Sequence, residues 1–282
     1  MEKIKKIREW THKHAIPAAF IAFAVIEVIL LSIGRLLSLL PKELPIKYFN
    51  EAILVLIPIA IVFFFGFSNA FKKGNFFKGL FLFLPYIVLQ LIMIGIFFGK
   101  NIGNPETNWQ PWYLILYGII SIICVAVREE CIYRATIQNI VAKKHANSVK
   151  GVWITVIVSS IIFGLCHIFN IFFGVAPISV LTQVLSGFIL GLLFGAIYLR
   201  SGSLWAIIFI HTLTDIVGLA ESTFLNINDV ENMNQLSISW GRIILYLIYI
   251  GFTIYLLRPS KCNQIYERFC FADEKSDLSI DA

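Results

Sequence analysis

The sequence predicts an all-α fold: a polytopic membrane bundle of about eight transmembrane helices. Hydrophobic residues make up 58% of the 282 positions and charged residues only 14%, a balance too apolar for a soluble domain. Apolar stretches of about 17–25 residues, long enough to cross a hydrocarbon core of about 30 Å, recur from end to end. The net charge of +6 needs no nucleic-acid partner, because Lys and Arg collect in the cytoplasmic loops of membrane proteins.

Eight apolar stretches are the expected spans within one membrane domain, residues 1–282, that contacts the lipid bilayer. They are residues 15–40, 52–71, 76–98, 111–142, 151–173, 176–199, 203–220 and 241–257. The first is too long for the apolar region of a cleaved signal peptide, so we expect it to be retained as a span. Residues 259–282 are polar, and we expect a loosely ordered cytoplasmic tail there.

Basic residues alternate from loop to loop. With the N-terminus inside, the inner loops carry 16 Lys and Arg, not counting Arg128 and Arg134 within the fourth span. The outer loops carry only Lys42, Lys47, Lys100 and Arg242. Because an excess of Lys and Arg marks the cytoplasmic side, we expect a multi-pass protein of the cell membrane with both termini in the cytoplasm.

The five cysteines are odd in number and show no CxxC spacing. Three lie in apolar spans and two in the tail, so we expect free thiols rather than a disulfide framework or a zinc knuckle.

The sixth span carries Gly187, Gly191 and Gly195, a doubled GxxxG pattern. Glycine at four-residue spacing lets two helix backbones approach closely in lipid. This pattern favours a helix-packing surface over a substrate groove.

Three polar clusters interrupt the apolar spans. They are Glu129–Arg134 in the fourth span, His167 after an apolar stretch in the fifth, and His211 with Asp215 in the seventh. An ionisable side chain at mid-membrane is costly and indicates either a partner or a function.

Helical spacing predicts how these side chains combine. Glu130 and Arg134 are four residues apart, so they can form an ion pair on one helix face, while Glu129 lies about 100° around the helix and stays available. His211 and Asp215 are also four residues apart and face the same way. Phe163 precedes His167 by one turn and can shield it from lipid.

The depth of the clusters predicts that they meet. Glu129 and His167 are equally far from the turn at residues 145–151, about 28 Å at 1.5 Å per residue. His211 lies eight residues beyond Ser203, roughly 12 Å from the inner face. All three clusters can therefore converge in the inner half of the membrane.

A carboxylate and a histidine that converge in this way can activate a water molecule as a general base. A second histidine and an aspartate can stabilise an oxyanion. These are the parts needed for amide hydrolysis. Each also has a structural reading, since Glu130–Arg134 could be only a stabilising ion pair and His167 only a packing residue.

EExxxR, FxxxH and HxxxN/D in successive spans resemble the three motifs of the CPBP family, membrane proteases related to type II CAAX prenyl endopeptidases. The resemblance covers residues 111–220, where Arg200–Trp205 before His211 also resembles the family. It implies a glutamic-type intramembrane endopeptidase that needs no cofactor or metal and cuts a membrane-associated peptide or protein. It also implies Glu129 and His167 as the water-activating residues, His211 and Asp215 as the oxyanion site, and Glu130 with Arg134 as the supporting pair.

Asp215 departs from the commoner family residue, asparagine. An amide can donate a hydrogen bond to an oxyanion, whereas an ionised carboxylate can only accept one. Asp215 must therefore carry a proton in order to donate, or act by orienting His211.

Two other hydrolytic mechanisms compete with this reading. Zinc could be held by Glu129, His167 and His211, although HExxH is absent and the residues are scattered over three helices. Cys131 or Cys166 could act beside His167, but burial in an apolar helix leaves a thiol inert.

Two further classes of function do not involve cleavage. A membrane scaffold or regulator, or a bacteriocin-immunity protein of the same fold, is compatible with the family resemblance. A transporter would require broken helices or paired repeats. Richness in Ile, Phe, Lys and Asn favours a bacterial source, for which a peptide precursor, bacteriocin or leader peptide is a better substrate than a prenylated protein.

Overall fold

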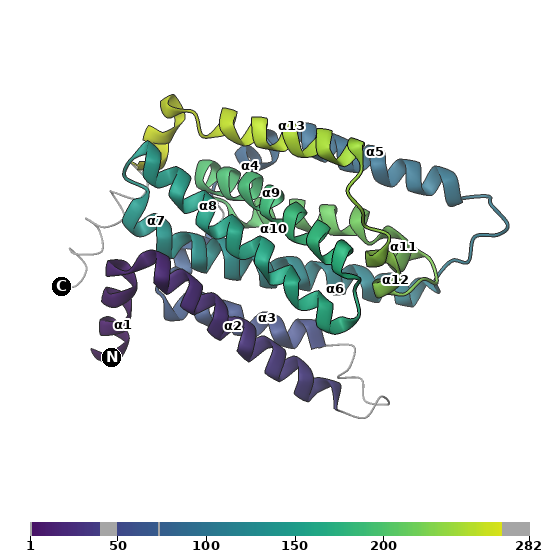
Figure 1. Ribbon diagram of the computed structural model, residues 1–282, viewed down its shortest axis with the longest axis horizontal. Helices are drawn as coiled ribbons and strands as arrows, with labels where there is room; N and C mark the ends of the chain where they lie inside the picture. The colour runs from purple at the N-terminus through teal and green to yellow at the C-terminus, as the bar shows by residue number, and fades with distance from the viewer. Residues whose placement is uncertain (1, 40–49, 73, 267–282) are drawn as a thin grey trace.

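The computed structural model describes residues 2–39, 50–72 and 74–266. In these ranges the chain is helical apart from connecting loops and one isolated antiparallel bridge between Trp109 and Leu225. Most of the long helices run roughly along the long axis of the molecule (Figure 1). The structure confirms the predicted all-α polytopic bundle.

Each predicted span contains at least one helix. In order, these helices are α2 (Ala15–Ser38), α3 (Asn50–Phe64), α4 (Phe76–Leu82) with α5 (Leu84–Asn101), α6 (Trp112–Glu130), α8 (Val149–Leu165), α9 (Pro177–Ser201), α10 (Leu204–Gly218) and α13 (Trp240–Leu256). The remaining helices are α1 (Glu2–Lys13), α7 (Asn139–His145), α11 (Ala220–Phe224), α12 (Asp229–Asn234) and three short segments, η2 (Ser68–Phe71), η3 (Cys131–Gln138) and η4 (Cys166–Phe173).

The count of eight membrane spans is not confirmed. Among the described residues, four helices are long and apolar enough to cross a membrane alone, namely Ala15–Ser38, Leu84–Asn101, Val149–Phe173 and Pro177–Ser201. A fifth is reached if α13 and the helix Pro259–Tyr266, bent by 62°, are counted as one span. Helices α3 and α10 are apolar but shorter.

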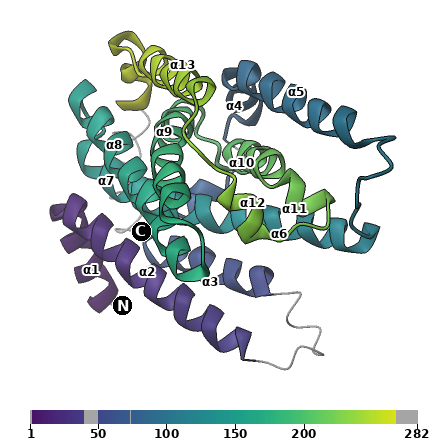
Figure 2. The ribbon, with the colours of Figure 1, turned by 45° about the vertical axis from the view of Figure 1, so that its right-hand side comes forward.

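The predicted helical hairpin is present. Helix α6 continues without a break through η3 into α7, and α8 returns beside it after a short turn (Figures 1 and 2). Ser148 begins α8, because its side-chain oxygen accepts from the backbone N–H of Gly151 at 3.1 Å. Only glycine fits at position 151, since a Cβ there would lie 1.6 Å from the carbonyl oxygen of His145.

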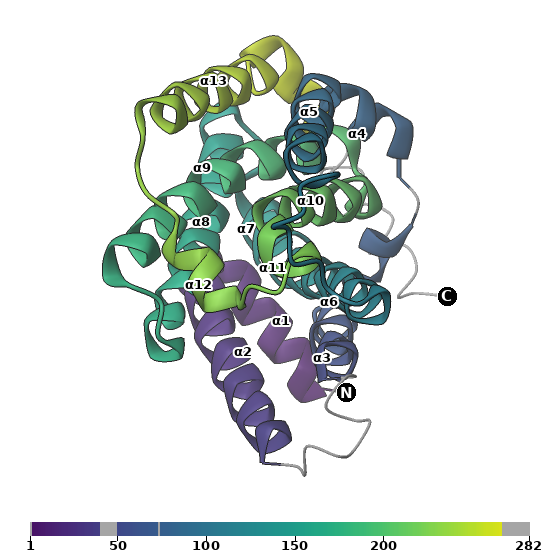
Figure 3. The same ribbon diagram turned by 90° about the vertical axis from the view of Figure 1, so that its right-hand side faces the viewer.

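Helix α9 lies among the other helices, with α8 on one side and α13 near it (Figure 3). Its glycines face α8 and the fourth span: a Cβ on Gly191 would lie 3.0 Å from Ser160 Cα, and one on Gly195 would lie 3.1 Å from Gln138 Oε1. The expected helix-packing surface is therefore confirmed. Gly202, with φ of 71°, ends α9 and allows the tight turn into α10.

The expected loose tail after Pro259 is wrong for its first part. Residues 259–266 form a helix, and Cys262 and Ile265 are fully buried in the main hydrophobic core. Their spacing of three residues places both on one helix face. This spacing could have indicated a helix, but the tail as a whole is polar, and the prediction used only its overall polarity. Residues 267–282, including Cys270, lie outside the described part; the other four cysteines are free, as expected.

Contacts between distant segments define one end of the bundle. Arg200 Nη1 donates to the carbonyl oxygen of Leu256 at 2.8 Å, and the side chain of Lys144 donates to that of Lys13. The backbone N–H of Asn75 donates to the carbonyl oxygen of Ser201 at 3.2 Å. These contacts bring the predicted inner loops together at one end of the bundle. Lys100 lies in the last turn of α5 and Arg242 in the first turn of α13, so both lie away from that end.

Candidate active site

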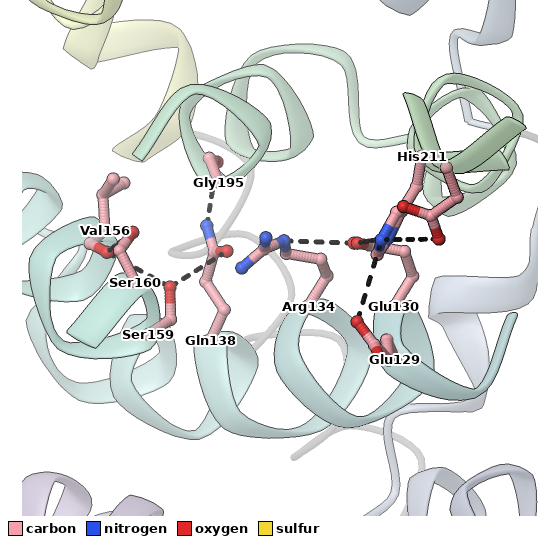
Figure 4. A network of polar contacts seen from close by, with 10 residues as sticks. Glu129, Glu130, Arg134, Gln138, Val156, Ser159, Ser160, Gly195 and His211 are labelled. Atoms are coloured by element: carbon pink, nitrogen blue, oxygen red, sulfur yellow. Dashed lines mark hydrogen bonds and ion pairs between the residues drawn. The ribbon is translucent and has the colours of Figure 1, made fainter. Parts of the chain in front are cut away.

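His211 on α10 is the centre of a buried polar cluster (Figure 4). Its Nδ1 lies 2.8 Å from Glu130 Oε1, and its Nε2 lies 3.7 Å from Glu129 Oε2. Nε2 is also 3.5 Å from Asp215 Oδ2, one turn along the same helix. We call Glu129, Glu130, Arg134, His211 and Asp215 the polar centre.

Helix α10 positions two members of the centre. Ser203 begins the helix by accepting from the backbone N–H of Ala206 at 3.3 Å, and His211 and Asp215 follow with four-residue spacing. The first five of its buried residues are apolar, so α10 packs into the core with His211 as its last buried residue. Phe163 and Phe194 approach the His211 ring at centroid distances of 5.8 Å and 5.6 Å.

Glu130 joins two positively chargeable groups. As predicted, its Oε2 lies 3.0 Å from Arg134 Nε, and both side chains are completely buried. Its other oxygen contacts His211, a link that helical spacing alone could not predict. The Arg134 guanidinium also lies over the Phe163 ring, 4.8 Å from its centroid.

The motif segment η3 is a π-helix rather than the expected α-helix. All eight of its residues, Cys131–Gln138, are buried. Within it, the Gln138 side chain donates to the carbonyl oxygen of Gly195 at 2.9 Å and accepts from Ser159 at 3.4 Å (Figure 4). These contacts attach the end of the motif segment to α8 and α9. Single-turn π-bulges are common at functional sites, and sequence periodicity does not reveal them.

His167 lies on η4, a 3₁₀-helix that continues α8. The His167 ring lies 5.7 Å from the ring of Phe163, which also contacts His211. On its other neighbour, α9, Gly187 approaches so closely that an added Cβ would lie 2.8 Å from His167 Cδ2. In the described part of the chain no ion-pair contact joins His167 to Glu129. The fifth span therefore contacts the polar centre through Phe163, whose ring lies against both histidines.

Glu27 is a polar residue near the site that the sequence analysis missed. It is a half-buried acid within α2, and the fully buried Tyr133 hydroxyl donates to its Oε1 at 3.0 Å. Tyr133 lies four residues after Glu129 and packs on Phe163 at 5.0 Å. The available signal was the single carboxylate of the predicted first span, which lies within an apolar run.

Two further contacts support the neighbours of the site residues. Arg128, next to Glu129, forms an ion pair with Glu51 on α3. Thr214, next to Asp215, shares a hydrogen bond of 2.9 Å with the buried hydroxyl of Tyr86 on α5. Both contacts fix a helix turn that carries a residue of the polar centre.

The alternatives raised by the sequence can be compared with this geometry. Over residues 2–39, 50–72 and 74–266, no three His, Cys, Asp or Glu side chains form a group that could hold a metal ion. The Cys166 thiol donates to the carbonyl oxygen of Phe163 at 3.0 Å, and Cys131 is fully buried. Neither arrangement offers a thiol aligned with His167.

The fold and the polar centre together define a multi-pass helical membrane protein with a carboxylate–histidine site built from α6, η3 and α10. Residues 110–217 match the family described as type II CAAX prenyl endopeptidase Rce1-like. This match supports the CAAX protease-like family that the three motifs predicted, and that family is a family of proteases. The comparisons with curated proteins and with solved structures found no match.

Proposed function

We propose that this protein is an intramembrane endopeptidase of the glutamic type, which hydrolyses a membrane-associated peptide or small protein in the cytoplasmic half of the cell membrane. The observation that carries the proposal is the contact of one buried histidine, His211, with Glu129, Glu130 and Asp215. Three carboxyl groups from two helices converge on it inside the helical bundle. Burying several ionisable side chains together lowers the stability of the fold, so such a cluster indicates a functional site.

Glu129 is the carboxylate suited to activate water. Its side chain is 17% exposed, whereas that of Glu130 is fully buried and bonded to Arg134 and His211. Glu129 is therefore the more accessible of the two carboxylates and the one we assign to water activation. Glu129 takes a proton as the water oxygen attacks the peptide carbonyl, and His167 holds that water in line.

His211 is suited to stabilise the oxyanion through Nε2. Because the Glu130 carboxylate can only accept, His211 Nδ1 donates to it and carries a proton. Nε2 must then carry a second proton in order to donate, so the working form of His211 is the imidazolium. The surrounding carboxyl groups favour that cationic form.

Charge balance assigns a proton to Asp215. Glu129 and Glu130 as carboxylates are matched by Arg134 and a cationic His211, which leaves the polar centre neutral only if Asp215 is protonated. Uncompensated charge is expensive inside a membrane. A protonated Asp215 can donate to the oxyanion as the amide of an asparagine would. Glu129 finally passes its proton to the leaving amine, and the two peptide fragments separate.

The membrane peptidome tests this proposal and does not require the substrate to be identified first. Cells with the wild-type protein are compared with cells that carry Glu129→Ala, after equal protein amounts have been verified. We expect new peptide termini only with the wild type. Identical peptidomes would instead favour the non-proteolytic scaffold, regulator or bacteriocin-immunity function.

The metal-independent mechanism has its own test. Purified protein is treated with 1,10-phenanthroline or EDTA, and cleavage of a peptide found in the peptidome is measured. We expect no loss of activity. Loss that zinc restores would support the mechanism in which Glu129, His167 and His211 hold the ion.

A further inference from the structure

Helix α1 has the form of a helix that lies on a membrane surface. None of its twelve residues is buried, and Ile4, Ile7 and Trp10 recur every third position with exposed fractions of 39%, 44% and 44%. Three-residue spacing places these side chains along one side of the helix. The helix turns sharply away from α2 and crosses the end of the bundle (Figure 1).

Basic residues lie around the whole of helix α1, including its apolar side, where Lys3 precedes Ile7 by four residues. Lys3, Lys5, Lys6 and Lys13 are all exposed, and Lys6 contacts Glu2 at 2.7 Å. The helix contains five Lys or Arg and only two Glu. A helix with a large basic surface, an apolar side and a tryptophan at its edge is typical of interfacial helices that bind anionic lipid.

Contacts with the bundle hold α1 at the level where the first span begins. Arg8 Nε donates to the carbonyl oxygen of Phe64 at 2.9 Å, at the C-terminal end of α3. Lys144, in the last turn of α7, donates to the carbonyl oxygen of Lys13. The apolar helix α2 starts two residues later, at Ala15. Helix α1 is therefore fixed at the boundary between the apolar span and the aqueous phase.

From this arrangement we propose that α1 is a binding surface for anionic phospholipid headgroups on the basic, cytoplasmic side of the membrane. Ile4, Ile7 and Trp10 enter the boundary between headgroups and acyl chains. The exposed lysines contact lipid phosphates, and each lysine near an anionic surface is worth about a fivefold change in binding. The inference concerns the surface of the protein, so it stands whether or not the proposed peptidase activity is correct.

Hydrogen–deuterium exchange of residues 2–13 tests the proposal. The full-length protein is placed in nanodiscs of phosphatidylcholine alone or of phosphatidylcholine with phosphatidylglycerol. We expect slower exchange of these amides with phosphatidylglycerol, and loss of that protection in 0.5 M NaCl, because salt at about that concentration screens surface charge. Equal exchange in the two nanodiscs would overturn the proposal.

A pair of matched variants separates α1 from the charge of the whole protein. Lys3→Gln with Lys5→Gln should remove most of the protection given by phosphatidylglycerol, because the loss of two lysines weakens binding by about 25-fold, at roughly fivefold per lysine. Lys100→Gln with Arg242→Gln removes the same charge from the opposite end and should leave the protection unchanged. Equal losses in both variants would contradict the proposal, as would equal protection by inorganic phosphate in phosphatidylcholine nanodiscs.

Discussion

At the scale of single residues, His211 connects the groups of the polar centre. It binds Glu130 through one ring nitrogen and faces Glu129 and Asp215 through the other. The two nitrogens therefore have different environments: Nδ1 is committed to a buried carboxylate, while Nε2 faces the two more accessible carboxyl groups. In the proposed mechanism, this division holds the histidine in place through Nδ1 and leaves Nε2 for the substrate.

The protonation of Asp215 gives the first prediction. If Asp215 donates as a neutral acid, Asp215→Asn supplies a permanent donor of nearly the same shape and should keep much of the activity. Asp215→Ala should lower the rate by about 10²–10³, the usual loss for one oxyanion donor. The measurement is kcat for each variant on one cleavable peptide.

The pH dependence sharpens this comparison. If Asp215 is the neutral donor, we expect wild-type activity to fall when rising pH removes its proton, whereas an amide does not titrate. The alkaline fall should therefore begin at a higher pH in Asp215→Asn. An Asn variant as inactive as the Ala variant would contradict the neutral donor and favour an ionised Asp215 that orients His211.

Arg134 gives a prediction about stability. Arg134→Ala removes one of the two cationic partners of the buried Glu130, the one at 3.0 Å, and breaking a buried pair costs about 3–5 kcal/mol. We expect a lower yield of folded protein and a lower Tm in detergent. Exposed Lys6, paired with Glu2, offers the control: Lys6→Ala should leave both quantities unchanged, because exposed pairs contribute little. Normal yield and Tm for Arg134→Ala would show that the pair does not support the fold.

At the scale of elements, the close approach of α9 to the fifth span makes room for His167. A Cβ on Gly187 would lie 2.8 Å from His167 Cδ2 and 3.0 Å from its Nε2. Both distances are shorter than ordinary contacts between carbon atoms and their neighbours, so a side chain at position 187 must move the histidine ring. The glycine surface thus serves packing along most of α9 and the candidate site at one position.

Gly187→Ala should therefore lower activity while the fold persists. A displacement of about 1 Å at a reacting group can reduce the rate about 10²-fold. Gly95 on α5 provides the matched control, because an added Cβ there meets no atom within 4 Å, and Gly95→Ala should be silent. Peptide cleavage and Tm are measured for both variants. Full activity in Gly187→Ala would mean that the position of His167 does not matter for turnover.

Regular helical spacing explains which parts of the site could be predicted. The pairs Glu130–Arg134 and His211–Asp215 follow from four-residue spacing within one helix, and both are present. The contact between Glu130 and His211 joins residues 81 positions apart and depends on how α10 packs against α6. The π-helix and the 3₁₀-helix that carries His167 arise from tertiary packing, which hydrophobic periodicity does not encode.

At the scale of the whole molecule, hydrophobic length predicted the architecture because a bilayer demands apolar helices of a fixed length. Each predicted span contains a helix, yet their number as membrane crossings is not confirmed, since α3 and α10 are short. The helix at residues 259–266 was not predicted, because the segment is polar overall. Only two of its residues, Cys262 and Ile265, are buried in the core and attach it there.

The orientation of the bundle gives a prediction at this scale. The 16 basic residues of the inner loops against four in the outer loops predict that both termini lie in the cytoplasm. Reporter domains fused after Ala282 or inserted within residues 143–150 should therefore report a cytoplasmic location, and one within 226–236 an external location. The last segment contains Asn234, whose side chain accepts from the backbone N–H of Ala176 just before α9. A reversed result at any one site would require a different number of spans.

The central claim is that Glu129 activates the water that cleaves a peptide bond. The most direct measurement is turnover by purified protein in nanodiscs on a peptide identified in the peptidome, with products identified by mass spectrometry. Glu129→Gln keeps the size of the side chain and removes the base, so we predict no detectable cleavage at an unchanged Tm, while Glu106→Gln on an exposed loop cleaves like the wild type. Wild-type turnover by Glu129→Gln would contradict the account.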